Sequence, residues 1–143
     1  MTGTIAYAVE NDLGADEFID VLERSTLAER RPVKERVRIE TMLKHANLIV
    51  TARDGEGRLV GVSRCVTDFS FCCYCSDLAV DETLQGRGIG RRLIDESAKA
   101  AGPYAHFLLL AAPKAIGYYE KIGMRRVDNA FDRPDWKRFA DDS

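Results

Sequence analysis

The first part of the chain combines one short apolar run with two apolar stripes at helical spacing. Ile5 to Val9 is the run, and its length predicts a first strand. Asn11 or Asp12 is expected to begin the next element, and Pro32 closes a polar break that starts at Ser25. The stripes that predict two helices are Ala15, Phe18, Ile19 and Leu22, followed by Ile39, Met42, Leu43 and Ala46.

Three further strands are expected in the middle of the chain, separated by short polar turns. Leu48 to Arg53 and Leu59 to Val66 are apolar runs on either side of Asp54 to Gly57, whose sequence DGEG is typical of a hairpin turn. Phe71 to Val80 follows after a second short turn, Thr67 to Ser70. Connections this short join antiparallel neighbours. The pattern therefore predicts an antiparallel meander.

A strand, a glycine-rich turn and a helix follow one another after Asp77, and the rest of the chain is organised around them. Leu78 to Val80 ends the last strand of the meander, and Asp81 to Leu84 is a polar connector. Gln85 to Gly90 reads QGRGIG, with glycines at alternate positions. Helical spacing then extends to Ala101, and the face that we expect to be buried consists of Gly90, Leu93, Ile94, Ser97, Ala98 and Ala101.

This order of elements favours the binding of an anion at the turn. The first N–H groups of a helix have no partner inside the helix, and the aligned peptide dipoles place partial positive charge there. Glycines remove side chains, so a phosphate or diphosphate can approach the main chain. Arg87, Arg91 and Arg92 add mobile positive charge. The alternative is a tight capping turn that binds no ligand.

Two better-known phosphate-binding motifs do not fit this turn. A dinucleotide fingerprint needs G-x-G-x-x-G, and Gly90 comes one place too early to be its third glycine. The position about 20 residues further on, where that motif has an acidic residue, falls in the apolar run Leu108 to Ala112. A P-loop closes with Gly-Lys followed by Ser or Thr, and this sequence is absent from the chain.

The C-terminal part predicts one strand, one short helix and a last strand. His106 to Ala111 is a continuous apolar strand that should lie parallel to Leu78 to Val80, because the helix crosses over between them. Pro113 is expected to open a short helix that runs through Tyr119 and ends at a Gly123 cap. A last strand is expected at Met124 to Val127. The tail from Asn129 carries Phe131, Trp136 and Phe139, which we expect to pack against the protein.

Length and charge narrow the class of protein. A chain of 143 residues suggests one domain, residues 1–143. The net charge of −2, from 21 basic and 23 acidic residues, gives no reason to expect a nucleic-acid or membrane partner. No apolar run reaches the ~18 residues of a membrane span, and the N-terminus lacks the pattern of a signal peptide. We therefore expect a cytoplasmic protein.

The four cysteines are expected to pack as small apolar side chains. Cys72, Cys73 and Cys75 crowd into one strand, where alternation places Cys73 and Cys75 on one face and Cys72 on the other. A reactive thiol near the functional site and a metal site are the alternatives. Cys72 and Cys75 have the spacing of a metal-ligand pair, but no second pair accompanies them. No bound metal is therefore expected.

Two segments resemble the GNAT superfamily of acetyl-CoA-dependent N-acetyltransferases. Leu78 to Ile94, LAVDETLQGRGIGRRLI, is similar to the family's cofactor signature, in which Q/R-x-x-G-x-G/A follows the fourth strand. Ala115 to Met124, AIGYYEKIGM, is similar to its A-x-x-F-Y-E-K-x-G-F segment. The resemblance covers most of the chain from about Leu48 to Val127. It implies an α+β fold: a mixed, mostly antiparallel sheet with a splayed parallel pair, flanked by about four helices.

The resemblance also implies roles for individual residues. Backbone groups near Leu78 to Val80, left unpaired by the splay, would bind the peptide-like pantetheine arm of coenzyme A. An N–H of Leu78 or Ala79 would stabilise the oxyanion that develops on the thioester. Tyr119 matches the tyrosine that protonates or orients the leaving sulfur, whereas Tyr118 matches a packing residue. The cofactor-binding residues implied by the resemblance are Leu78, Ala79, Val80, Gln85, Gly86, Arg87, Gly88, Ile89, Gly90 and Arg91.

The general base is left open. Some members of the family carry a glutamate on the fourth strand, and Tyr74 occupies that position here. Asp77 is the nearest carboxylate, and it faces away from Tyr74 unless a bulge intervenes. The alternatives are water or another of the nearby carboxylates, Asp68, Asp81 and Glu82. Ala112 and Met124 also depart from the family pattern, which frequently has Asn and Phe there.

A basic cluster precedes the second expected helix, in the region that covers the acceptor cleft in the family. It could recruit an anionic acceptor, or form a solvated face together with the acidic residues that alternate with it. The cluster consists of Arg30, Arg31, Lys34, Arg36 and Arg38.

The resulting hypothesis is an N-acetyltransferase that uses acetyl-CoA as cosubstrate. The acceptor is a primary amine of an unidentified small molecule or peptide, and it attacks directly in a ternary complex. One alternative is a catalytically silent acyl-CoA-binding or sensing module. Another is a regulator that binds a nucleotide diphosphate at the same turn. The resemblance makes a homodimer a further expectation.

Overall fold

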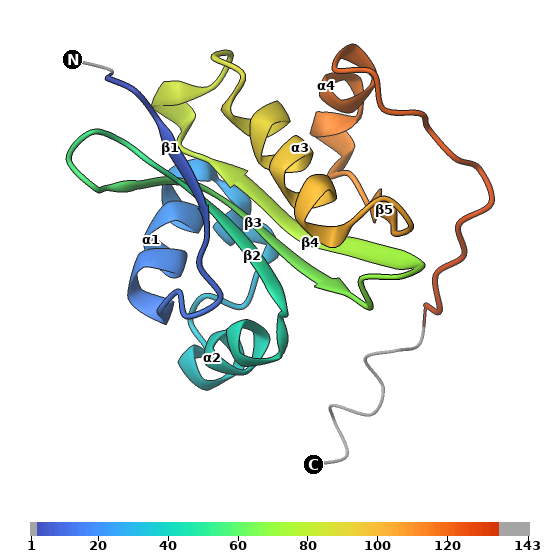
Figure 1. Cartoon of the computed structure of the whole chain (residues 1–143). Helices are drawn as coiled ribbons and strands as arrows, with labels where there is room; N and C mark the ends of the chain where they lie inside the picture. Colours follow the sequence, from blue (N-terminus) through green and yellow to red (C-terminus); the bar gives the residue numbers. More distant parts are fainter. Residues whose placement is uncertain (1–2, 135–143) are drawn as a thin grey trace. The chain divides into compact units, whose positions relative to one another are not determined.

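Residues 3–134 are described in the computed structural model, where five strands form one mixed sheet (Figure 1). The strand order is β1-β2-β3-β4-β5. The first four strands pair antiparallel, and β5 pairs parallel with β4. The strands are β1 (Ala6–Val9), β2 (Leu48–Arg53), β3 (Leu59–Thr67), β4 (Cys72–Val80) and β5 (His106–Leu109). The mixed sheet and its flanking helices confirm the predicted fold class.

The described residues divide into two compact units at Leu110. The first unit contains the sheet together with α1 (Ala15–Ser25), α2 (Arg36–His45) and α3 (Ile89–Ala101), besides two 3-10 turns. The second unit contains a 3-10 turn, Pro113–Ala115, and α4 (Ile116–Lys121). No helix of the described part is both long and apolar enough to cross a membrane.

The helices of the first unit cover both faces of the sheet (Figure 1). Ile49 packs with residues of α1 and α2, such as Phe18 and Ile39. Its neighbours along β2 point the other way, and Val50 packs with Leu93 of α3. Because β2 and β3 are buried on both faces, they are mostly apolar rather than alternating, with buried polar residues such as Thr51 and Ser63 as exceptions. The apolar runs predicted for these strands are confirmed.

The helix predicted after the glycine turn is confirmed with one added residue at its start. Its buried residues are Ile89, Gly90, Leu93, Ile94, Ser97 and Ala101, whereas Ala98 is only partly buried. The first helix starts later than expected, at Ala15 after a Gly14 cap. Asn11 instead accepts a hydrogen bond from the Ile49 N–H at 2.8 Å and joins the loop to β2.

The last predicted strand, Met124 to Val127, is wrong. These residues lie in irregular structure after α4, and α4 itself extends two residues beyond Tyr119. A strand needs a neighbour for its backbone groups, and the described residues of this unit supply none. Gly123 does end the helix as predicted, with a φ of 93°. In the tail, Phe131 is 97% exposed and does not pack as expected; Trp136 and Phe139 lie outside the described residues.

Candidate functional site

The glycine turn joins β4 to α3 and leaves its main chain open. Gly86 and Gly88 have φ values of 81° and 82°, in the left-handed region that residues with a side chain rarely adopt. A Cβ atom at either position would meet no atom within 4 Å. The two glycines therefore expose backbone on the open side of the turn.

The N-terminus of α3 presents N–H groups that its own ladder does not use. The first bond of the helix runs from Arg92 N–H to the Gly88 carbonyl at 3.0 Å. The N–H groups of Ile89, Gly90 and Arg91 precede that bond and have no partner four residues back. Gly88 is the N-cap residue, and it has no side chain to cap them. Open glycines and unused N–H groups together fit a phosphate or diphosphate.

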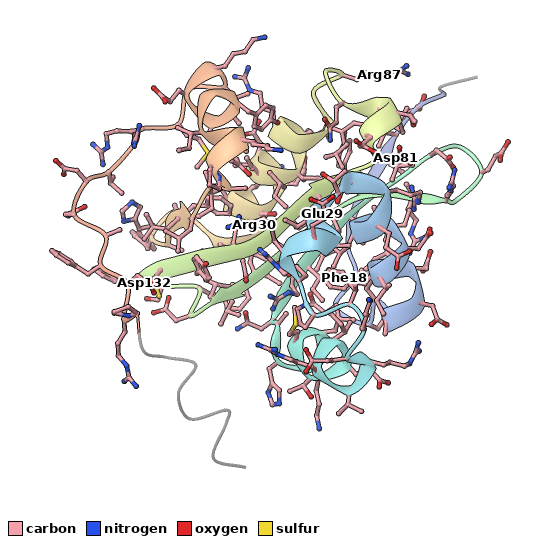
Figure 2. The ribbon with its side chains drawn as sticks, turned by 180° about the vertical axis from the view of Figure 1, so that it is seen from behind. Phe18, Glu29, Arg30, Asp81, Arg87 and Asp132 are labelled. Atoms are coloured by element: carbon pink, nitrogen blue, oxygen red, sulfur yellow. The ribbon has the colours of Figure 1, made fainter. Side chains whose placement is uncertain are left out.

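The three arginines near the turn do not behave alike. Arg87 and Arg91 are exposed, and Figure 2 shows Arg87 extending from the turn into open space. Arg92 is not the mobile charge that we expected. Its guanidinium lies 4.7 Å from the ring centroid of Tyr7 and bonds to Glu96 at 2.9 Å. Two of the three arginines are therefore available to an anion.

Asp81 anchors the chain just before the turn, a role that the sequence did not reveal. One carboxylate oxygen accepts bonds from Thr83 N–H at 2.9 Å and Thr83 Oγ1 at 2.7 Å, within the 3-10 turn Glu82–Leu84. The other accepts a bond from Arg24 of α1 at 2.6 Å. Burial opposes ionisation, but the bonds from Thr83 and Arg24 outweigh it and lower the pKa of Asp81.

The parallel strand covers a different part of β4 from the one we expected. β5 pairs with Cys72 to Cys75, and the register ends at Cys75 opposite Leu109. The predicted parallel direction of the strand is confirmed, but its pairing is with Cys72 to Cys75 and does not reach Leu78 to Val80. Leu78 to Val80 pair only with β3 within the described residues. Their other edge is left without a strand neighbour, as the splayed pair of the family implies.

A bulge in β4 changes which side chains share a face. Arg64 lies opposite Asp77 and Cys65 lies opposite Cys75, so Ser76 has no partner in β3. Alternation therefore shifts by one residue, and Tyr74 and Asp77 point to the same face. This is the face on which α1 and α2 lie. Tyr74 is 41% exposed there.

The carboxylates that were candidates for a general base are mostly engaged. Asp77 is 1% exposed, and its two oxygens accept bonds from the Nε groups of Arg31 and Arg64. Asp68 caps the turn between β3 and β4 by accepting three backbone N–H bonds. Asp81 is held by Thr83 and Arg24. Among the four carboxylates considered, Glu82 is the exposed one without such bonds in the described structure.

The basic cluster, which extends into the first turn of α2, is mainly a solvated face. Arg36 and Arg38 are exposed and pair with Asp16 and Glu35 at 2.6 and 3.4 Å. Arg31 is different, because its side chain reaches the buried Asp77.

Three of the four cysteines are buried as expected, beneath α3. The Ser63 hydroxyl lies 3.4 Å from the Cys65 sulfur and 3.5 Å from the Cys75 sulfur. A hydrogen bond with Cys75, and to a smaller extent the one with Ser63, lowers the pKa of Cys65 to about 7. Burial instead raises the pKa of Cys73 to about 12. Cys72 is exposed, which corrects the expectation for that residue. In the part that the structure describes, no group of three or more His, Cys, Asp or Glu side chains could hold a metal ion.

Tyr119 lies in α4, in the second unit. Its ring meets that of Tyr118 edge-to-face, with ring centroids 5.2 Å apart and planes at 76°. Tyr118 is 39% exposed, so it is less buried than the packing residue we expected. The role implied for Tyr119 remains a prediction.

A family model described as "Acetyltransferase (GNAT) domain" matches residues 44–125. The chain belongs to the GNAT acetyltransferase family. The match includes the glycine turn, α3 and the segment around Tyr119, and it begins close to Leu48, where the resemblance in the sequence begins.

Curated relatives of this GNAT chain are named as N-acetyltransferases. The uncharacterized N-acetyltransferase ycf52 of Porphyra purpurea is 28% identical over 99 residues, which are 66% of this chain and 55% of that protein. The chain therefore spans about half the length of this relative. The ycf52 protein of Pyropia yezoensis is 24% identical over 121 residues, covering 78% of this chain and 68% of that protein.

Solved structures share the fold. A protein of Pyrococcus horikoshii OT3 is 25% identical with a TM-score of 0.71, covering 90% of this chain and 93% of that one. A putative acetyltransferase of Deinococcus radiodurans is 18% identical with a TM-score of 0.66, covering 94% of each chain. At 18% sequence identity, the similarity to the Deinococcus radiodurans protein supports the shared fold and not a shared function.

Proposed function

We propose that this GNAT chain is an N-acetyltransferase that transfers the acetyl group of acetyl-CoA to a primary amine. The observation that carries the proposal is the open glycine turn, where left-handed Gly86 and Gly88 precede unused N–H groups of α3. Residues 1–143 would act as one domain. The acceptor would be a small molecule or a peptide.

Two stretches of main chain would hold the cosubstrate. The turn and the start of α3 would bind the diphosphate through backbone N–H groups, with Arg87 and Arg91 adding positive charge. The unpaired edge of Leu78 to Val80 would bind the pantetheine arm as an added strand would. The residues proposed to contact it are Leu78, Ala79, Val80, Gln85, Gly86, Arg87, Gly88, Ile89, Gly90 and Arg91.

The chain's own groups would then assist the transfer. Acetyl-CoA supplies an activated acetyl thioester when it is bound. An N–H of Leu78 or Ala79 would stabilise negative charge on the thioester oxygen. Tyr119 would donate a proton to the departing sulfur. An amine with the pKa of lysine, about 10.4, must first lose a proton. Because Asp77 is paired with two arginines, we assign this step to water or to the exposed Glu82.

Binding and turnover together test the proposal. The affinity for acetyl-CoA is measured by calorimetry, and release of the free thiol of coenzyme A is followed with a panel of primary amines. We expect saturable binding, competition by coenzyme A but not by ATP, and thiol release that depends on the amine. Tight binding without amine-dependent release would instead indicate a silent acyl-CoA-binding module. Displacement of acetyl-CoA by ATP would indicate a nucleotide-binding regulator.

A further inference from the structure

The bulge at Ser76 lies at the point in β4 after which the strand pairs with β3 alone, whereas before it the strand pairs with both β3 and β5. Ser76 has no partner in β3, and the β5 register ends one residue earlier, at Cys75. The extra residue of a bulge is left out of the ladder, so the ladder does not fix its peptide groups. Leu78 and Ala79 follow after Asp77, and the N–H of one of them was proposed to face the thioester.

One side chain holds the Ser76 carbonyl in place of the ladder. Arg31 Nη2 donates a bond to it at 2.7 Å. The same guanidinium donates through Nε to Asp77 Oδ1 and through Nη1 to the Arg30 carbonyl at 2.8 Å. Because the guanidinium is planar and its N–H directions are fixed, these contacts set its orientation. Arg31 belongs to the segment between α1 and α2, so it also ties that segment to β4.

A second arginine completes the attachment from the sheet itself. Arg64 of β3 is 7% exposed and donates through Nε to Asp77 Oδ2. The buried Asp77 carboxylate is therefore held from two directions, by one arginine of the neighbouring strand and one of the α1–α2 connection. Removing either partner would leave a buried charge poorly compensated.

We propose that Arg31 is a positioning residue for acetyl transfer. It fixes the Ser76 peptide and thereby the direction of the N–H, of Leu78 or Ala79, that was proposed to face the thioester. Productive geometry must be held within about 0.5 Å, and a displacement near 1 Å can cost about 100-fold in rate. This inference rests on the proposed function. Arg31 contacts Ser76 and Asp77 and makes no bond to the glycine turn or Asp81 in the described structure, so its loss should leave the diphosphate site intact and lower turnover much more than acetyl-CoA affinity.

The test compares Arg31→Lys with Arg53→Lys. Lysine at position 31 keeps the positive charge beside Asp77 but cannot reproduce the fork that also reaches Ser76. Arg53 is a matched control: its side chain is 22% exposed against 23% for Arg31. It also binds carboxylates, Glu10 and Glu17, and a backbone carbonyl, that of Gly57. Its contacts lie at β1, α1 and the β2–β3 turn, away from the bulge.

We expect Arg31→Lys to lower kcat about tenfold or more, with a much smaller loss of affinity for acetyl-CoA, because the diphosphate contacts at the glycine turn stay in place. Amide hydrogen exchange at Leu78 and Ala79 should become faster in the same variant. Arg53→Lys should leave kcat and exchange at these two amides unchanged, even if the melting temperature falls. For Arg31→Ala, added ethylguanidinium should restore part of the lost turnover.

Wild-type kcat and unchanged exchange in folded Arg31→Lys would overturn this inference alone. An equal loss of kcat in Arg53→Lys would also overturn this inference, because the loss would then result from general destabilisation of the protein. Wild-type protein that shows no amine-dependent thiol release would overturn the proposed function, and this inference with it.

Discussion

The main chain of Gly61 lies directly against Leu93, where α3 packs on β3. A Cβ atom on Gly61 would meet Leu93 Cδ1 at 3.0 Å and Ile89 Cγ2 at 3.3 Å. Leu93 and Ile89 belong to the first turns of α3. The absence of a side chain at position 61 therefore sets how closely the N-terminal half of this helix approaches the sheet.

The first prediction follows from this contact. Gly61→Val should lower the free energy of unfolding by about 1–3 kcal/mol, the usual cost of overpacking a core. It should also weaken acetyl-CoA binding, because the start of α3 must move. Urea unfolding and calorimetry measure the two effects. Gly55→Val is the control, since a Cβ at Gly55 meets nothing within 4 Å. Equal stability of the two variants would contradict the prediction.

The second prediction concerns the glycine turn. Gly88→Glu should abolish acetyl-CoA binding, because it places bulk and negative charge where the diphosphate would lie. The substitution also strains a left-handed residue, at a cost of about 1–2 kcal/mol. Gly57→Glu introduces the same strain, since Gly57 has a φ of 83° against 82° for Gly88. Calorimetry should show normal binding for Gly57→Glu only. Normal affinity in folded Gly88→Glu would exclude this site.

The third prediction separates the two neighbouring tyrosines of α4. Tyr119→Phe should lower turnover at least tenfold and leave acetyl-CoA affinity largely intact, because loss of a general acid costs about 10²–10⁴-fold. Tyr118→Phe removes the adjacent hydroxyl as a control and should keep wild-type turnover. Thiol-release kinetics across a range of pH values provide the measurement. Wild-type turnover of Tyr119→Phe at every pH would remove the acid role.

The fourth prediction concerns the thiols. In the native protein, only Cys72 should react rapidly with a thiol reagent such as DTNB, because it is the exposed cysteine of the four. Cys65, Cys73 and Cys75 should react at the rate at which the structure opens. Cys72→Ser should remove the fast phase, and Cys73→Ser should preserve it. If two or more thiols per wild-type protein reacted rapidly, the cysteines beneath α3 would be accessible and the prediction would be wrong.

The fifth prediction is a pH dependence of stability. Backbone N–H bonds from Phe71, Cys72 and Ser70 lower the pKa of Asp68 to about 2. An unfolded aspartate titrates near 3.9, so the stabilisation is complete above about pH 4 and is lost as the pH falls toward 2. Between pH 5 and pH 2, wild type should lose more unfolding free energy than Asp68→Asn.

Chemical denaturation at each pH measures this difference. Glu56→Gln, at an exposed position in the β2–β3 turn, controls for the loss of one acidic group. Curves for wild type and Asp68→Asn that run parallel through this range would contradict the assignment.

The local pattern of apolar and polar residues was enough to predict most of the helices and strands, and the glycine turn. Leu48 to Arg53 was predicted with the bounds that β2 has, because an apolar run bounded by turn residues carries its own signal. The spacing of Gly86 and Gly88 before a helical stripe gave the strand–turn–helix order. Met124 to Val127 failed because a strand depends on a neighbour, which a run of four residues cannot specify.

The sequence by itself determined which residues face a core and where the chain can turn, since period and turn chemistry act over a few neighbours. Only the tertiary structure decided the bulge at Ser76, the end of the β5 register at Cys75 and the pairing of Asp77 with Arg31 and Arg64. These features join residues as many as 46 positions apart. The stability of these features depends on which polar groups are brought together and removed from water when the chain packs. A local sequence pattern does not contain that information.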